Sequence, residues 1–231
     1  TPLARLLGRL LSRGGHAVVL IDSSPQHSHE AQEDDLRVVF GNALEEGTLY
    51  RAELDTRRGA LGVLANDAVN LLFAREARER FGLESVAIAT APDPGSVTDE
   101  SLRELGATRL FSGPTDAELW SVRIRRGSAT IETWIAGSPP DGGGTEPAGA
   151  RGEGDDPREA LRGVALPLVY RREEQLWPVT EAYRAKPKDL VAWLVLEERR
   201  EEAAAQLGRL GWSPSAQGEE AEAALSADRA P

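Results

Sequence analysis

The feature that most constrains this 231-residue chain is an apolar run that ends in a carboxylate, His16-Ala17-Val18-Val19-Leu20-Ile21-Asp22. A continuous aliphatic run without alternation is typical of a strand buried on both faces, as in the parallel sheets of α/β proteins. Asp22 would then stand at the carboxyl edge of the sheet, where open α/β folds bind their ligands.

A second run of the same kind follows at Arg37-Val38-Val39-Phe40 and ends in the tight-turn tripeptide Gly41-Asn42-Ala43. Two such strand ends, side by side, predict a crevice of nucleotide size. The alternative interpretation is that Asp22 only caps a turn and that Gly41 only permits one. The residue pattern is compatible with both.

Composition excludes several classes of function. The chain has no Cys, which rules out disulfides, zinc–thiolate sites and thiol catalysis. Its 27 Lys and Arg residues stand against 38 Asp and Glu residues, a net charge of -11, which argues against nucleic-acid binding. No apolar run approaches the roughly 20 residues of a membrane-spanning helix. We therefore expect a soluble, cytoplasmic chain that is not itself inserted in a membrane.

Helical and strand patterns alternate through the first half of the chain, which predicts an α/β fold with a parallel sheet. We expect helices at 2–13, 43–54, 67–81, 98–105 and 116–126, a short helix near Glu30, and strands at 16–22, 37–40, 59–65, 85–91 and 108–111. In the helix at 67–81, the inner side is expected to carry Val69, Leu72, Phe73 and Ala77. The first helix is the second half of a β-α-β unit whose first strand is missing. We therefore expect a short apolar strand and a Gly-rich phosphate loop before Thr1.

The sequence pattern predicts that the second half of the chain is divided into several shorter segments. A connecting helix and strand are expected at 114–136, and the alternation of apolar and polar residues over 128–135 predicts a half-exposed strand. A flexible Gly/Pro/acid linker is expected at 137–156, and a small β-rich lobe at 157–212 that begins with one or two helical turns at 157–162. The lobe cannot bury a core of its own at this size. From Ser213 to the end, the composition predicts a disordered tail at 213–231.

In residues 1–113 the order of motifs resembles the RCK/TrkA-N domains, the nucleotide-binding regulatory modules of potassium channels and cation transporters. The matching residues are Gly15-His16-x-Val18-Val19-Leu20-Ile21-Asp22, Val38-Val39-x-Gly41-Asn42-Ala43 and Ala65-Asn66-Asp67-x-x-Asn70-Leu71. The continuation looks most like the cytosolic C-terminal tail of NhaP-type sodium/proton antiporters, and the lobe is similar to TrkA-C. This resemblance implies a Rossmann-like, doubly wound parallel sheet with a smaller TrkA-C-like lobe.

The resemblance also implies a function. Such a module binds NAD(H) or an adenine nucleotide (ATP, ADP or AMP) and passes its occupancy to the membrane domain of a cation/proton antiporter or potassium transport system. It would act as a homodimer in the cytoplasm, at the inner face of the cell membrane.

The implied nucleotide-binding residues lie at strand ends. Asp22 would hold the ribose, Gly41-Asn42-Ala43 would approach the adenine, and Ala65-Asn66 would line the floor of the crevice. Ser23 and Asp67 belong to the same implied site. Thr1, at a helix N-terminus, would face the phosphates. The family usually has Gly-Asp-Ala where this chain has Gly41-Asn42-Ala43.

The charge of Asp22 bears on which nucleotide fits. A carboxylate accepts two hydrogen bonds from a ribose diol but would repel a 2′-phosphate by about 4 kcal/mol near a surface. No Arg follows Asp22 to offset this repulsion. The residues therefore favour NAD(H), ATP, ADP or AMP over NADP.

Other interpretations stay open for the same residues. Thr1, Asn66 and Asp67 can all act as helix caps, with or without a ligand. A small NAD-dependent oxidoreductase would need a proton donor beside the nicotinamide, but Tyr183-x-x-Lys186 has the wrong spacing for this. A dimerisation scaffold without ligand could use Trp120. His27-x-His29 is interpreted as a pair of solvated loop residues, not a metal site.

Overall fold

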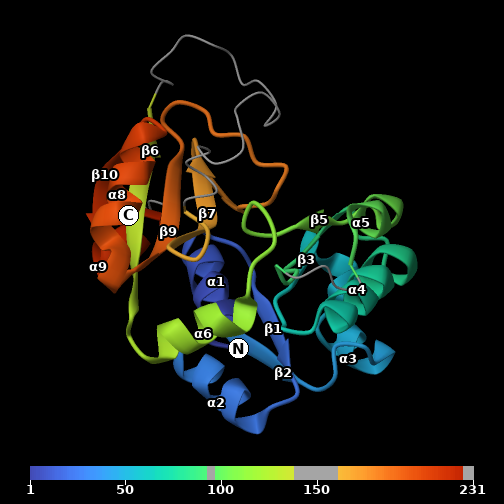
Figure 1. Ribbon diagram of the computed structural model, residues 1–231. Coiled ribbons are helices and arrows are strands. Elements are labelled where there is room, and N and C mark those ends of the chain that lie inside the picture. The colour runs from blue at the N-terminus through green and yellow to red at the C-terminus, as the bar shows by residue number, and fades with distance from the viewer. Residues whose placement is uncertain (93–96, 138–160, 226–231) are drawn as a thin grey trace.

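The computed structural model describes residues 1–92, 97–137 and 161–225 (Figure 1). Its first half alternates helices and strands, which confirms the predicted α/β class. The elements are α1 (Pro2–Arg13), β1 (Val19–Asp22), α2 (Pro25–Glu33), β2 (Arg37–Phe40), α3 (Glu46–Arg51), β3 (Gly59–Gly62), α4 (Asp67–Arg75), β4 (Ser85–Ile88), α5 (Asp99–Leu105) and β5 (Thr108–Arg109). A 3₁₀ turn at Leu54–Thr56 follows α3, and a π-helical turn at Glu76–Arg80 extends α4.

The strands of this half are all parallel but form two separate sheets. β1 pairs with β2, and β4 lies between β3 and β5. Among the described residues, β1 and β3 are not paired with each other. A strand between them, before Thr1, stays a prediction.

Helices cover both faces of these sheets, as in a doubly wound fold. α1 presents Leu3, Leu7 and Leu10 to one core, and all three are at most 2% exposed. α3, α4 and α5 close a second core on the other face, to which they contribute Leu49, Ala74 and Leu102. α1 starts as its sequence predicts, because the Thr1 hydroxyl accepts the Ala4 N–H and Pro2 fits the first turn.

β1 and β2 are less buried than predicted. Each residue of β1 is partly exposed, and Phe40 at the end of β2 is 57% exposed. The expectation of strands buried on both faces was therefore wrong here. The cause is position, because β2 is an edge strand and β1 pairs on one side only among the described residues.

The inner face of α4 also differs from the prediction. Leu72, expected to point inward, is 46% exposed, whereas Asn70 and Ala74 are buried. Asn70 is buried because its amide holds two strand exits together, donating to the carbonyls of Leu64 and Ala89 at 2.8 and 2.9 Å. On the inner face of α4, a hydrogen-bonded asparagine is therefore buried, whereas the leucine that the apolar periodicity predicted to be buried is exposed.

The second half forms an antiparallel, five-stranded sheet reached through α6 (Ala117–Arg125). Its strands are β6 (Ala129–Ala136), β7 (Ala165–Arg172), β8 (Gln175–Pro178), β9 (Leu190–Leu196) and β10 (Trp212–Gln217), in the order β10-β6-β9-β7-β8. The β-rich lobe that the sequence predicts is therefore present. β6, predicted to be half-exposed, instead lies inside the sheet with Glu132 buried.

Both faces of this sheet are covered, so every residue of β9 is buried. Leu190, Ala192 and Leu194 share a core with α1 and with α9 (Gly218–Leu225), while Val191, Trp193 and Val195 pack against α8 (Arg200–Arg209). Figure 1 shows α1 beside this sheet, between it and β1. The lobe thus completes its core with α1.

The predicted disordered tail is wrong for residues 213–225. β10 pairs with β6, and α9 buries Ala221 and Leu225 completely. The predicted linker at 137–156 and the start of the helical turn after it fall almost entirely in 138–160, outside the described residues.

Candidate functional site at the carboxyl ends of β1, β2 and β3

Asp22 and Gly41 lie at the same rim of the parallel sheet. Asp22 is in register with Phe40, and the Gly41 N–H donates to the Asp22 carbonyl at 3.1 Å. Parallel strands end at a common edge, so the juxtaposition predicted from two strand ends is present.

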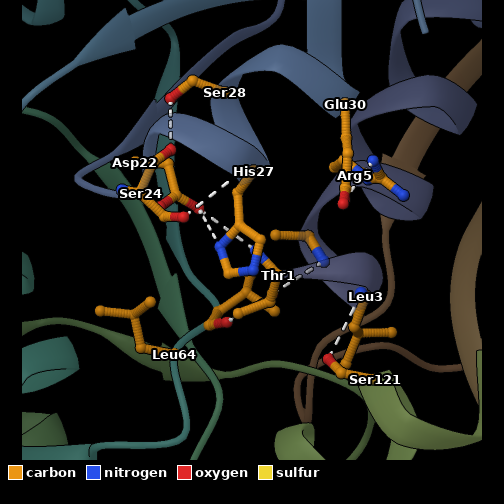
Figure 2. A network of polar contacts seen from close by, with 12 residues as sticks. Thr1, Leu3, Arg5, Asp22, Ser24, His27, Ser28, Glu30, Leu64 and Ser121 are labelled. Atoms are coloured by element: carbon orange, nitrogen blue, oxygen red, sulfur yellow. Dashed lines mark hydrogen bonds and ion pairs between the residues drawn. The ribbon is translucent and has the colours of Figure 1, made fainter. Parts of the chain in front are cut away.

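The Asp22 carboxylate already has partners within the chain (Figure 2). Its Oδ1 accepts the Ser24 N–H at 2.9 Å. Its Oδ2 lies 3.3 Å from His27 Nδ1 and 3.3 Å from the backbone nitrogen of Thr1. The side chain is 20% exposed, so a ligand can still reach it but must share or displace these contacts.

His27 is the residue of this site that the sequence interpretation missed. It was expected in a solvated loop, but it lies in the first turn of α2 and its side chain is only 33% exposed. Ser24 caps this helix by accepting the His27 N–H at 3.3 Å, and this turn carries the ring back over Asp22. The sequence signal was Ser24-Pro25, a strong helix start directly after a strand.

Helix α2 is fixed against α1 by an ion pair, which also fixes His27. Arg5 Nη1 donates to Glu30 Oε2 at 2.7 Å. A hydrogen bond from the Gln26 amide lowers the pKa of Glu30, and the nearby Arg5 lowers it further. Glu30 therefore stays ionised, and the two helices hold the rim from one side.

Gly41 is required by close packing. Its φ is +155°, and a Cβ at this position would lie 2.6 Å from Thr48 Oγ1 on α3. Directly after it, Asn42 Oδ1 accepts the Leu44 N–H at 3.0 Å, an Asx turn that includes Ala43. The backbone of Gly41-Asn42-Ala43 is thus held close to Asp22, and the Asn42 side-chain oxygen is already hydrogen-bonded within the turn.

Thr1 lies between the ends of β1 and β3. Besides capping α1, its hydroxyl donates to the Val63 carbonyl at 3.4 Å. The Leu3 N–H, also at this helix start, donates to the hydroxyl of buried Ser121 at 3.4 Å (Figure 2). A phosphate at this helix end would therefore compete with partners that the chain supplies.

The predicted floor residues follow β3 and act within the chain. Asn66 Oδ1 caps α4 by accepting the Val69 N–H at 3.2 Å, and both carboxylate oxygens of Asp67 lie 3.0 Å from the Ala91 N–H. Ala65 and Asn66 are exposed at the rim. The cap interpretation is thus confirmed for Thr1 and Asn66, and contact with a ligand stays a prediction for all of these residues.

Two hollows in the structure lie away from this rim. One of about 140 Å³ is lined by Gly14, His16, Arg58 and Trp177, and one of about 290 Å³ by Leu61, Ser85, Thr108, Tyr170 and Trp177. Both lie near the amino ends of the parallel strands. Asp22 and Gly41 lie at the opposite, carboxyl ends of β1 and β2.

Two other features are absent from residues 1–92, 97–137 and 161–225. No three His, Asp or Glu side chains there gather in a way that would hold a metal ion. In the same residues, no helix combines the length and apolarity needed to cross a bilayer.

Comparison with known families bears directly on this rim. The family model described as the TrkA-N domain matches residues 2–113, which span every strand end described above. Residues 2–113 form a TrkA-N domain. The predicted family is thereby confirmed, together with the Rossmann-like fold of this half.

Solved structures similar to this chain include one described as "GsuK channel bound to NAD" and one described as "Crystal Structure of the GsuK RCK domain". Both are 15% identical to it, with TM-scores of 0.40 and 0.32. The alignments cover 91% and 82% of this chain. They cover only 38% and 41% of the length of the two matched chains. No curated protein matches this chain.

Proposed function

We propose that this chain is a cytosolic, nucleotide-sensing regulatory module of a monovalent cation transport system. Its ligand is NAD(H) or an adenine nucleotide (ATP, ADP or AMP), bound at the rim of the TrkA-N domain. The observation that carries the proposal is the placement of Asp22 and Gly41 together at the shared carboxyl ends of β1 and β2, where the Gly41 N–H donates to the Asp22 backbone carbonyl.

The chemistry of the rim favours a ligand with a free ribose diol. A carboxylate has about four acceptor positions, and three contacts from the chain leave one for the first hydroxyl of a ribose diol, so that the second hydroxyl must displace one of these contacts. The negative charge opposes a 2′-phosphate, as in NADP.

The partner in this proposal is the membrane domain of a cation/proton antiporter or potassium transporter, with the chain acting as a homodimer. α1 offers a route for the signal within each copy. It begins at Thr1 beside Asp22, and beyond its other end His16 Nε2 lies 2.6 Å from the Leu176 carbonyl in the lobe. Ligand contact at one end of this rigid helix is thereby linked to the packing of the lobe.

Thermal unfolding with NADH, NADPH, ATP, ADP and AMP tests the proposal. A ligand at 100 times its Kd stabilises the folded state by about 2.7 kcal/mol, which raises the Tm of a domain this size by on the order of 5–10 °C. NADPH should give the smallest shift. No shift with any of the five would contradict the proposal.

A pair of variants tests the role of Asp22. Asp22→Asn keeps the shape but removes the charge, and we expect it to weaken binding by about 10-fold or more, since hydrogen bonds to charged groups contribute about 1.5–3 kcal/mol. The matched control is Glu33→Gln on α2, whose side chain is 66% exposed. Equal affinities for both variants would make Asp22 a turn residue only.

The two rival functions are less well supported by the structure. For the enzyme, the Tyr183 hydroxyl donates to Asp189 at 2.9 Å, and burial raises its pKa, so it stays protonated and cannot act as a base. For the ligand-free scaffold, Trp120 is only 3% exposed and belongs to the core of this copy. Turnover of NADH by this chain would support the oxidoreductase function. Light scattering that shows only monomer would contradict the proposed homodimer.

A further inference from the structure

Phe40 is the most exposed large apolar side chain in the described parts of the chain, at 57%. It ends β2 directly before Gly41, and the preceding Val38 and Val39 are half-buried. A single exposed apolar residue is ordinary on a protein surface. What distinguishes Phe40 is its neighbour across the sheet.

Phe40 and Asp22 are register partners in the parallel pair of β1 and β2. Neighbouring strands lie about 4.8 Å apart, and residues two apart on a strand project from the same face. The Leu20 side chain points toward Gly8 of α1, with its Cδ2 3.4 Å from the position that a Cβ on Gly8 would occupy, so Asp22 projects from the α1 face as well. Its register partner Phe40 projects from that face beside it.

The backbone that carries this ring is held on both sides. The Gly41 N–H donates to the Asp22 carbonyl at 3.1 Å, and Arg51 Nη2 donates to the Phe40 carbonyl at 3.2 Å. Arg51 in turn contacts Thr48 Oγ1 at 3.1 Å, the atom that leaves no room for a Cβ at Gly41. The position of Phe40 relative to Asp22 is thus fixed, while most of the ring surface stays accessible.

We propose that Phe40 is the stacking platform for the base of a nucleotide whose ribose is held by Asp22. This inference rests on the function proposed above and adds the residue that recognises the base. In a nucleoside the base is attached at C1′, next to the C2′ that carries one of the diol hydroxyls. A ribose held by Asp22 therefore brings its base within reach of the strand beside it, where Phe40 offers an aromatic face.

Stacking recognises an aromatic base without reading its hydrogen-bonding edge, because every base has a π-face. Phe40 should therefore contribute equally to the binding of AMP and GMP. It should contribute nothing to ribose 5-phosphate, which has the diol and a phosphate but no base. This pattern separates stacking from a general loss of site structure.

Calorimetric titration of the whole chain with AMP, GMP and ribose 5-phosphate tests the inference in wild type, Phe40→Leu and Phe40→Tyr. We expect Phe40→Leu to weaken AMP and GMP binding by about 10-fold, in the range found when one stacking side chain is removed. Phe40→Tyr should bind like wild type because it keeps the ring. The matched control is Tyr50→Leu, which removes a 55% exposed aromatic from α3.

Unchanged AMP affinity in Phe40→Leu would overturn the inference, and the proposed function would stand if Asp22→Asn still weakened binding. Absence of AMP and GMP binding in the wild type would also overturn the inference, whereas the proposed function would be overturned only if NADH, NADPH, ATP and ADP failed to bind as well. A direct measurement does not depend on the variants: nuclear Overhauser contacts between the Phe40 ring and the base protons of bound AMP are expected in the wild type. Their absence in the saturated complex would also overturn the inference.

Discussion

The imidazole of His27 faces the carboxylate of Asp22 at the end of β1, with 3.3 Å between Nδ1 and Oδ2 (Figure 2). One side chain comes from the first turn of α2 and the other from the strand that precedes this helix. The contact occupies an acceptor position that a ribose hydroxyl would need. His27 is therefore a competitor of the ligand within the chain.

Removal of this ring should strengthen nucleotide binding. In His27→Ala the ribose hydroxyl no longer displaces the imidazole from Oδ2, and the net value of one polar contact of this kind, about 0.5–1.5 kcal/mol, corresponds to roughly 2- to 10-fold in affinity. The measurement is the Kd of AMP by calorimetry. The matched control is His29→Ala on the same helix, whose side chain is 74% exposed. Weaker binding in His27→Ala would show that the ring contacts the ligand.

The meeting of Asp22 and Gly41 was predictable because it follows from local rules. Two apolar runs that end in a carboxylate and a glycine become parallel strands, and parallel strands end at a common edge. The position of His27 could not be predicted from the sequence, because the direction of α2 depends on the Ser24 cap and on the ion pair between Arg5 and Glu30. Such details come from packing between elements rather than from periodicity.

The C-terminal segment shows the same limit on a larger scale. Its Ser, Ala, Glu and Pro content is typical of disorder, yet α9 is ordered because distant parts of the chain cover it. Ala221 and Leu225 enter the core formed by α1 and β9. Glu222, 6% exposed, contacts Arg9 Nη2 at 2.5 Å and also Arg13. The sequence of 213–225 alone contains none of these partners.

Truncation of the fully buried Leu225 tests whether α9 belongs to the core. We expect Leu225→Ala to lower the free energy of unfolding by about 2–5 kcal/mol, as for other buried leucines. Glu220→Ala, an exposed position on the same helix, should stay within about 0.5 kcal/mol of wild type. Urea denaturation at neutral pH measures both. Equal stability of the two variants would mean that α9 is not docked in solution.

Buried acids were a further feature that local pattern did not reveal. Glu132 accepts from Arg200 Nε at 2.6 Å, and Asp189 accepts from Arg172 Nη2 at 2.7 Å. Each pair joins positions far apart in sequence. An acid in an alternating strand pattern predicts an exposed position until its partner is known, and Glu132 was one of the polar positions in the alternation that predicted a half-exposed strand at 128–135.

Asp189 carries the densest set of these contacts. Burial alone would raise its pKa, but hydrogen bonds from Arg172, the Lys186 N–H and the Tyr183 hydroxyl outweigh this and hold the pKa below the ordinary value of 3.8. The pKa of Asp189 is lower in the folded protein than in the unfolded chain. The ionised carboxylate therefore stabilises the fold in full at pH values above the pKa of the unfolded chain. This contribution is lost as the pH falls through the folded-state pKa.

Asp189→Asn should therefore destabilise the protein in a pH-dependent way. At pH 7 we expect a loss of about 3 kcal/mol, because the variant leaves Arg172 without its charged partner. The difference from wild type should shrink as the pH is lowered below about 4, where the wild-type carboxyl also becomes protonated. Urea denaturation from pH 7 down to the acid limit of folding measures this, with exposed Glu174→Gln as the control. A difference that stays constant with pH would show that Asp189 acts through shape and not through charge.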